Sequence, residues 1–203
     1  SETFFRRNKI GNIRTIIRAK LITPTSENPF CKYTIKKTLQ ILAPSDTSRN
    51  LKIKTVGINT DRAQLISAVL NKHYFEDPVY GNGMLNIVSG IQLEDTAVDL
   101  GAALALVSSM EDITYPHNLI VLGEIGLKGE IRQIQNIIQR LKDALRCGYT
   151  SAIIPYDNAV NISTENKEFE DMKIFGAKNV KEAIEYANEQ SSLVIHKIIS
   201  KFT

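Results

Sequence analysis

The feature that most constrains the fold is the alternation, from residue 52 onward, of short strand-like runs with longer helix-like segments. The strand-like runs are rich in β-branched residues and stop at glycine, proline or polar turn residues. The helix-like segments repeat apolar residues every three or four positions. Helices and strands in alternation bury their apolar faces against each other, so the pattern predicts a mixed α/β or α+β domain.

Capping residues and breakers set the boundaries of the expected elements. Asn59 and Asp61 offer N-cap chemistry, and Gly148 is suited to the position just after a helix end. We expect helices over about Asn59–Lys72, Thr96–Ser109 and Asn136–Cys147 and from Val180 to Ala187, and strands over Ile13–Ile22, Tyr33–Leu42, Lys52–Ile58, Met84–Ser89, Asn118–Leu122, Gly129–Ile134, Ser151–Ile154 and Met172–Phe175. A polar loop is expected over about 156–170.

These elements divide the chain into three parts. Residues 1–50 are a basic, β-rich N-terminal segment of the same domain, residues 51–190 are its main body, and residues 191–203 are a C-terminal tail. No apolar run approaches the roughly 20 residues that cross a bilayer, and the first residues lack a signal-peptide core. We therefore expect a cytoplasmic protein without a membrane partner.

Cysteine and histidine usage predicts neither a disulfide nor a metal site. Cys31 and Cys147 lie far apart and neither belongs to a Cys-x-x-Cys pair, so two reduced thiols are expected. The three histidines, His73, His117 and His196, are scattered without the spacing of metal ligands. The sequence therefore predicts no bound metal in this chain.

The formal net charge of +3 conceals a strong asymmetry. Residues 1–60 hold 12 Lys and Arg residues against three Asp and Glu residues, a charge of +9, so the rest of the chain carries −6. A basic segment of this kind is either the footprint of a polyanion such as DNA or a solvated β-rich surface. The candidate nucleic-acid-binding residues are Arg14, Arg18, Lys20, Lys36, Lys37, Lys52, Lys54 and Arg132.

One stretch resembles a known signature. Residues 122–132 read Leu-Gly-Glu-Ile-Gly-Leu-Lys-Gly-Glu-Ile-Arg, and a helix with Arg140, then Gly148 and the apolar strand Ala152–Pro155 follow. This order resembles the C-terminal domain of Lon proteases, and its Glu-Ile-Arg form looks closer to the Lon-like domain of RadA (Sms) DNA repair proteins. The similarity runs convincingly from about residue 52 to residue 187, and includes segments 55–65, 86–91, 99–100 and 107–109.

The resemblance implies an α+β fold like that of the Lon protease C-terminal domain (ribosomal protein S5 domain 2-like), with mixed sheets and packed helices. It also implies a homo-oligomer, usually a hexameric ring, and a parent protein that is a DNA-dependent ATPase acting on recombination intermediates. ATP and zinc are expected only in the parent's other parts, its ATPase core and zinc finger, so that this chain would be a C-terminal fragment.

The catalytic dyad of Lon peptidases is a serine activated by a lysine. The resemblance places these two positions at Val98 and Ile138, whose hydrocarbon side chains can neither attack a carbonyl nor accept a proton. No Gly-x-x-x-x-Gly-Lys-Ser/Thr loop is present for a nucleotide triphosphate either. We therefore expect that this chain is not an enzyme and that it serves ring assembly and DNA binding. The alternatives are a Lon-family Ser/Lys peptidase and a purely structural ring scaffold without DNA contact.

Two charged residues near these positions have competing interpretations. Asp99 could be a catalytic carboxylate, but a Thr-x-x-Asp capping arrangement with Thr96 at the helix start is favoured. Arg132 could contact DNA or a neighbouring subunit, or it could form a surface ion pair with Glu124 or Glu130.

Overall fold

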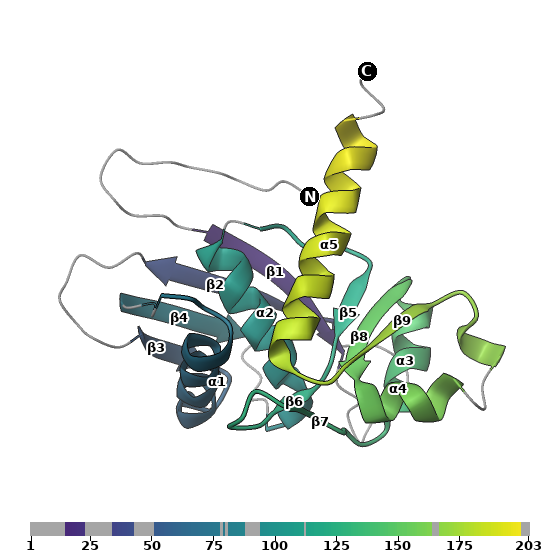
Figure 1. Cartoon of the computed structure of the whole chain (residues 1–203), viewed down its shortest axis with the longest axis horizontal. Helices are drawn as coiled ribbons and strands as arrows, with labels where there is room; N and C mark the ends of the chain where they lie inside the picture. Colours follow the sequence, from purple (N-terminus) through teal and green to yellow (C-terminus); the bar gives the residue numbers. More distant parts are fainter. Residues whose placement is uncertain are drawn as a thin grey trace.

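The structure, a computed structural model, describes residues 15–22, 34–42, 51–77, 79, 81–87, 94–111, 113–163 and 167–199. Its α-helices are α1 (Thr60–His73), α2 (Asp99–Met110), α3 (Ile137–Arg146), α4 (Tyr156–Ser163) and α5 (Val180–Ile199), with short 3-10 helices η1 (Thr96–Val98) and η2 (Lys167–Phe169). Its strands are β1 (Thr15–Ile22), β2 (Thr34–Leu42), β3 (Leu51–Val56), β4 (Gly81–Ile87), β5 (Leu119–Val121), β6 (Glu124–Ile125), β7 (Ile131–Arg132), β8 (Ser151–Pro155) and β9 (Lys173–Ala177) (Figure 1).

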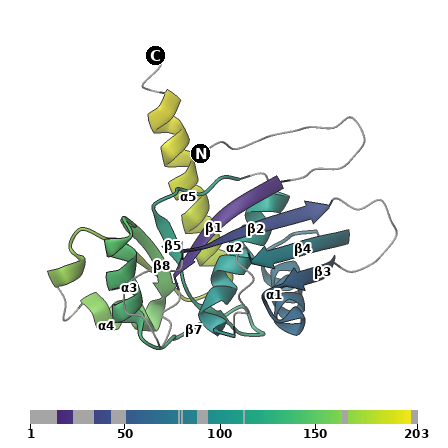
Figure 2. The same ribbon diagram turned by 180° about the vertical axis from the view of Figure 1, so that it is seen from behind.

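Two sheets and one short hairpin form the framework. The larger sheet has the order β1-β2-β4-β3, antiparallel except for the parallel pair β3–β4 (Figure 2). The second sheet, β5-β8-β9, is entirely parallel, and β6 and β7 form an antiparallel hairpin. The described part is thus a mixed α/β structure with five α-helices and both kinds of strand pairing, which confirms the predicted mixed sheets with packed helices.

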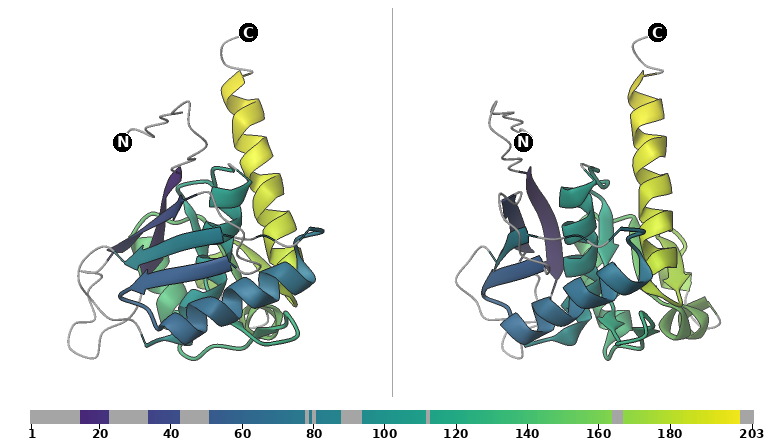
Figure 3. Two further views of the ribbon diagram at one scale, coloured as in Figure 1. Left: turned by 90° about the vertical axis from the view of Figure 1, so that its left-hand side faces the viewer. Right: turned by 60° about the vertical axis from the view of Figure 1, so that its left-hand side comes forward.

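Helix α2 is the centre of the core. Every residue from Asp99 to Ser109 is buried, which is typical of a helix that has packing partners on all sides. It packs against β1 and β2 of the larger sheet, against α1 and against α5. Helices α1 and α2 lie on one side of the larger sheet, as the right-hand view in Figure 3 shows.

Among the expected elements that differ from those observed, two differ for identifiable reasons. The predicted helix from Thr96 starts with the 3-10 turn η1, and its N-cap is Asp95, whose Oδ1 accepts a hydrogen bond from the amide of Ala97 at 3.0 Å. The predicted polar loop after residue 155 begins with helix α4. Its Asn158 is buried and bonds both the N–H and the carbonyl of Ile134, at 2.9 and 3.1 Å. Asn158, a polar residue typical of loops, is therefore buried here, and its side chain is hydrogen-bonded to the backbone of the segment before α3.

The C-terminal end of α3 agrees with the prediction. Gly148 has φ of 84°, the left-handed conformation that glycine adopts most easily after a helix end. The amides of Gly148 and Tyr149 close the helix by bonding the carbonyls of Leu145 and Ala144, at 2.9 and 3.0 Å.

Cys147, just before this glycine, is disulfide-bonded. The expectation of a reduced thiol at this position is therefore wrong, because spacing in the sequence does not reveal which cysteines approach each other in the fold. The chain's other cysteine, Cys31, lies outside the described residues. Within the described ranges, no helix combines the length and apolar character needed to cross a membrane.

Candidate nucleic-acid interface

At the described side chains of β3 and β4, the larger sheet has one face toward the core and one toward solvent. Along β3 and β4, Ile53 and Leu85 are buried, whereas Lys54, Val56 and Met84 are exposed. The exposed fraction is 51% for Val56 and 37% for Met84, so even apolar side chains on this side remain in contact with water. Because α1 and α2 cover the opposite side, we call this solvent side the open face.

The strand register extends the open face across all four strands. Lys54 pairs with Met84, which pairs with Gln40, and because directly paired residues share a face, these positions lie together. The open face then comprises the register positions Ile16, Arg18, Lys20, Ile22, Thr34, Lys36, Thr38, Gln40, Leu42, Lys52, Lys54, Val56, Asn82, Met84 and Asn86. Five of these positions are basic and, among the positions so placed, none is acidic.

The register also sorts the candidate residues. Arg18, Lys20, Lys36, Lys52 and Lys54 share the open face, whereas Lys37 pairs with Ala19 and Ile87 and therefore shares the face of the buried Leu85. Adjacent strand residues alternate between faces, so Lys36 and Lys37 cannot serve one surface together. Arg14 lies outside the described residues, and Arg132 lies on β7, away from this sheet.

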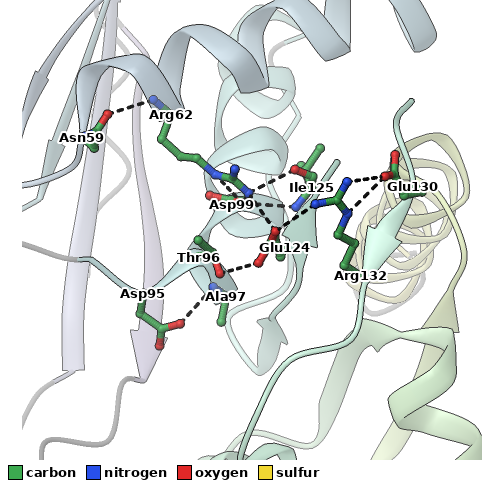
Figure 4. A network of polar contacts seen from close by, with 10 residues as sticks. All are labelled: Asn59, Arg62, Asp95, Thr96, Ala97, Asp99, Glu124, Ile125, Glu130 and Arg132. Atoms are coloured by element: carbon green, nitrogen blue, oxygen red, sulfur yellow. Dashed lines mark hydrogen bonds and ion pairs between the residues drawn. The ribbon is translucent and has the colours of Figure 1, made fainter. Parts of the chain in front are cut away.

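Directly after Val98, one of the predicted dyad positions, Asp99 forms a partly buried ion pair that joins α1 to α2 (Figure 4). The guanidinium of Arg62 donates two hydrogen bonds to Asp99 Oδ2, one of them from Nε at 2.9 Å, and its Nη2 also donates to the carbonyl of Ile125 at 3.1 Å. Asp99 Oδ2 further accepts the amide of Ile125 at 3.1 Å. The side chain of Asp99 is 0% exposed, and this burial raises its pKa, while the bonds from Arg62 and Ile125 oppose the rise.

Glu124 extends this pair into a network that reaches the β6–β7 hairpin. It accepts a hydrogen bond from Thr96 Oγ1 at 2.7 Å, and it lies 3.7 Å from Arg62 Nη2 and 3.4 Å from Arg132 Nη1. The predicted Thr96–Asp99 capping arrangement is wrong, because the Thr96 hydroxyl bonds Glu124 and the Asp99 carboxylate bonds Arg62. The network therefore ties α1, η1, α2 and the hairpin together (Figure 4).

Arg132 forms the outer end of the network. It pairs with Glu130 at 2.8 Å and with Glu124, and these contacts are the ion pairs that sequence reasoning allowed for it. The Arg132 hydrogen bond holds the pKa of Glu130 below its usual value. Any contact of Arg132 with DNA stays a prediction.

The two predicted dyad positions carry hydrocarbon side chains. Val98 is buried at the end of η1, and Ile138 is half-buried near the start of α3. Two neighbouring side chains have other partners: Ser108 donates its hydroxyl hydrogen to the carbonyl of Ile113, and Lys142 pairs with Glu168 at 2.7 Å. Throughout the part of the chain that the structure describes, no group of three or more His, Cys, Asp and Glu side chains could hold a metal ion.

Sequence reasoning missed one member of the network. Arg62 was placed on a helix without a role, because its partner Asp99 lies 37 residues away in the sequence. A single arginine in the first turns of a helix carries no signal for a buried partner, and only the packing of α1 on α2 brings the two together.

Comparison with known proteins gives the family. The chain matches the family model described as "Subunit ChlI of Mg-chelatase" over residues 45–158, more than half of its 203 residues. It is 34% identical to the DNA repair protein RadA of Escherichia coli (strain K12) over 146 residues, which cover 72% of this chain and 31% of that protein. The identity is 35% over 146 residues to RadA of Chlamydia pneumoniae, covering 72% and 32%, and 37% over 124 residues to RadA of Pseudomonas aeruginosa, covering 60% and 27%.

The chain thus spans less than a third of the length of these curated relatives. One expectation needs correction: the prediction that this chain is not an enzyme is contradicted, because the matching family model describes a subunit of an enzyme, Mg-chelatase. The missing Gly-x-x-x-x-Gly-Lys-Ser/Thr loop argues only against nucleotide binding by a P-loop, and the replaced dyad argues only against a Ser/Lys peptidase. Neither observation is sufficient to predict that the chain is not an enzyme. On the family match and the RadA relatives together, the chain belongs to the family of subunit ChlI of Mg-chelatase and is a RadA-type protein.

Proposed function

We propose that this chain is the DNA-contacting and subunit-assembly domain of a RadA-type DNA repair protein, with a Lon-like fold. The observation that carries the proposal is the open face, where the strand register places five basic positions and no acidic one on the same face of the larger sheet as the exposed Met84. A surface of this charge attracts the phosphate backbone of nucleic acids and releases condensed counterions when it binds.

The names of the relatives support this assignment. Proteins from Escherichia coli and Chlamydia pneumoniae that share about a third of their aligned residues with this chain are DNA repair proteins. DNA is therefore the polyanion to test first. Phosphate contacts carry no sequence information, so binding should be insensitive to DNA sequence and should weaken steeply with salt.

Assembly is the second half of the proposal. The resemblance to Lon-like domains favours a ring of identical subunits, and a ring would bring several open faces together around one DNA molecule. Repeated weak contacts in one assembly act at high effective concentration, so the ring would bind DNA far more tightly than a single chain.

The test is a fluorescence-anisotropy titration of labelled DNA with the purified chain between about 50 and 200 mM salt, with the mass measured by light scattering on the same sample. Five phosphate contacts per chain predict a slope of log affinity against log salt of about −4.5 for a duplex and about −3.5 for a single strand. A ring should multiply the apparent affinity, whereas a monomer should show the single-chain slope.

Two variants locate the contact. Lys54→Glu should weaken binding and reduce the magnitude of the salt slope by about one, because it removes one phosphate contact. Lys72→Glu is the matched control, since Lys72 is also exposed but lies in the last turn of α1, the helix on the other side of the sheet. If both variants lost the same DNA affinity, the open face would not be the binding site, and the loss would reflect the change in net charge alone.

A further inference from the structure

The register divides the basic positions of the open face into two groups. Lys20 and Lys36 pair with each other, and Arg18 lies next to Lys20 on the same face of β1. Lys52 and Lys54 lie on β3, at the other edge of the sheet. With strands about 4.8 Å apart and residues about 3.4 Å apart along each strand, the Cα atoms of Arg18 and Lys54 are about 16 Å apart. Those of Lys20 and Lys52 are about 25 Å apart.

The positions between the two groups carry no charge. They are the amide and hydroxyl residues Thr38, Gln40, Asn82 and Asn86 and the apolar residue Met84. The apolar Val56 lies beside Lys54 on the edge strand β3. The described side chains of Val56 and Met84 are exposed. A diagonal path across the sheet therefore runs from a basic corner, over a neutral and partly apolar centre, to a second basic corner.

We propose that the open face binds a single strand of DNA along this diagonal, with phosphates at the two basic groups and bases over the neutral centre. The inference rests on the proposed function, and it names the form of DNA that the open face takes. A path of about 25 Å accommodates a few nucleotides, which lies toward the small end of the site sizes known for sheet-based single-strand binders, about 4 to 16 nucleotides.

A duplex fits this arrangement less well. Its bases are recessed in grooves about 7.5 to 8.5 Å deep, and the major groove, about 12 Å wide, is narrower than a four-stranded sheet, so an undistorted duplex would contact the basic groups through its phosphates. The exposed Val56 and Met84 would then face a groove without touching a base. A single strand can turn its bases toward the sheet and cover these apolar side chains.

The composition of the centre sets the character of the binding. None of the open-face positions in the four described strands is Phe, Tyr or Trp, so base stacking on aromatic rings does not contribute there. Apolar contacts from methionine and valine make no hydrogen bonds that would distinguish one base from another. The site should therefore bind single strands regardless of sequence and should lose affinity steeply with salt.

The experiment compares a labelled oligothymidylate of about 15 nucleotides with a duplex of the same length, by fluorescence anisotropy at one salt concentration. The unchanged chain should bind the single strand more tightly. Met84→Ala should weaken single-strand binding by about threefold or more, because it removes the central apolar contact, and should leave duplex binding unchanged. Leu127→Ala is the matched control, since Leu127 is an exposed apolar residue outside the sheet, and it should change neither affinity.

Two results would overturn the inference while leaving the proposed function intact. One is a duplex bound as tightly as the single strand. The other is a Met84→Ala variant with wild-type circular dichroism and undiminished single-strand affinity. Failure of both DNA forms to bind would instead refute the proposed function itself, so the two failures are distinguishable.

Discussion

Replacing Arg62 by Ala should strongly destabilise the protein, because it leaves the buried carboxylate of Asp99 without its charge partner. Asp99 is 0% exposed, and in the variant it would retain only the amide of Ile125. Removing one partner of a buried ion pair costs about 3 to 5 kcal/mol. Because Asp99 can take up a proton, we expect the lower end of that range, a loss of about 3 kcal/mol in the free energy of unfolding at neutral pH.

The protonation of Asp99 gives this prediction a pH signature. Burial raises the pKa of Asp99, and the Arg62 hydrogen bonds oppose that rise, so Arg62→Ala should raise the pKa further. A carboxyl whose pKa is higher in the folded state than in the unfolded state favours folding at low pH and loses that contribution as pH rises. The gap in stability between the variant and the unchanged chain should therefore narrow as pH falls toward the acidic range.

A double-mutant cycle measures the pair itself. We would compare Arg62→Met, Asp99→Leu and the double variant by urea unfolding followed with far-UV circular dichroism. The double variant leaves no unpaired charge in the core, so it should be more stable than the sum of the single losses predicts, by about 2 kcal/mol. Additive losses would refute the claim that the two residues act as a pair.

The control within the same network is Arg132→Ala. Arg132 forms ion pairs of similar length, but its side chain is 54% exposed, so water replaces the lost partners. Its removal should leave the free energy of unfolding almost unchanged. Equal losses for Arg62→Ala and Arg132→Ala would show that burial does not decide the strength of these pairs.

Further predictions concern hydroxyl groups and glycines. The buried hydroxyl of Tyr149 has no hydrogen-bond partner among the described residues, so Tyr149→Phe should raise stability to urea by about 1 kcal/mol. Tyr115→Phe should lower it by about as much, because that hydroxyl donates a hydrogen bond to a side chain of α5 at 3.0 Å. Burial raises the pKa of Tyr149 from 10.0 to about 12, so the unfolded chain releases this proton more readily and the free energy of unfolding should fall as pH rises through that interval. In Tyr149→Phe this alkaline loss of stability should be smaller when unfolding is measured against pH. Gly126→Ala should lower the free energy of unfolding by about 1 kcal/mol, because the new Cβ would lie 2.0 Å from a carboxylate oxygen of Glu130 and displace that side chain from the turn. In a Glu130→Ala background, Gly126→Ala should lower the free energy of unfolding much less. Equal losses with and without Glu130 would contradict the proposed clash. Gly148→Ala should lower the free energy of unfolding by a similar amount, because φ at this position is 84°, a conformation that alanine adopts unfavourably. Thermal unfolding of the variant would measure this loss.

The sequence was sufficient for elements whose signals are local. The apolar spacing of α1 and α2, the capping residue Asn59 and the glycine after α3 all predict features that the structure has. Each depends on residues a few positions apart, where helix geometry alone decides which side chains meet. The family resemblance was also readable, because its central signature occupies the continuous stretch 122–132 and the other matching segments follow in the same order along the chain.

Features that depend on contacts distant in sequence were not predictable. The basic residues could be counted, but whether they share a face depends on the pairing of β2 with β1 and β4, which separates Lys36 from Lys37. The pairing of Arg62 with Asp99 depends on the packing of α1 against α2. Helix α4 was missed because the partner of Asn158 lies 24 residues earlier.

The burial of α2 on every side has a consequence for the motions of the molecule. A helix with a solvent face can fray or detach while its neighbours stay folded, but α2 contacts the larger sheet, α1 and α5 at once. Its amide hydrogens can reach water only when these layers separate, which amounts to unfolding the whole domain. Hydrogen exchange at Leu104 and Leu106 should therefore report the global free energy of unfolding, and these amides offer a local probe of the stability of the entire domain.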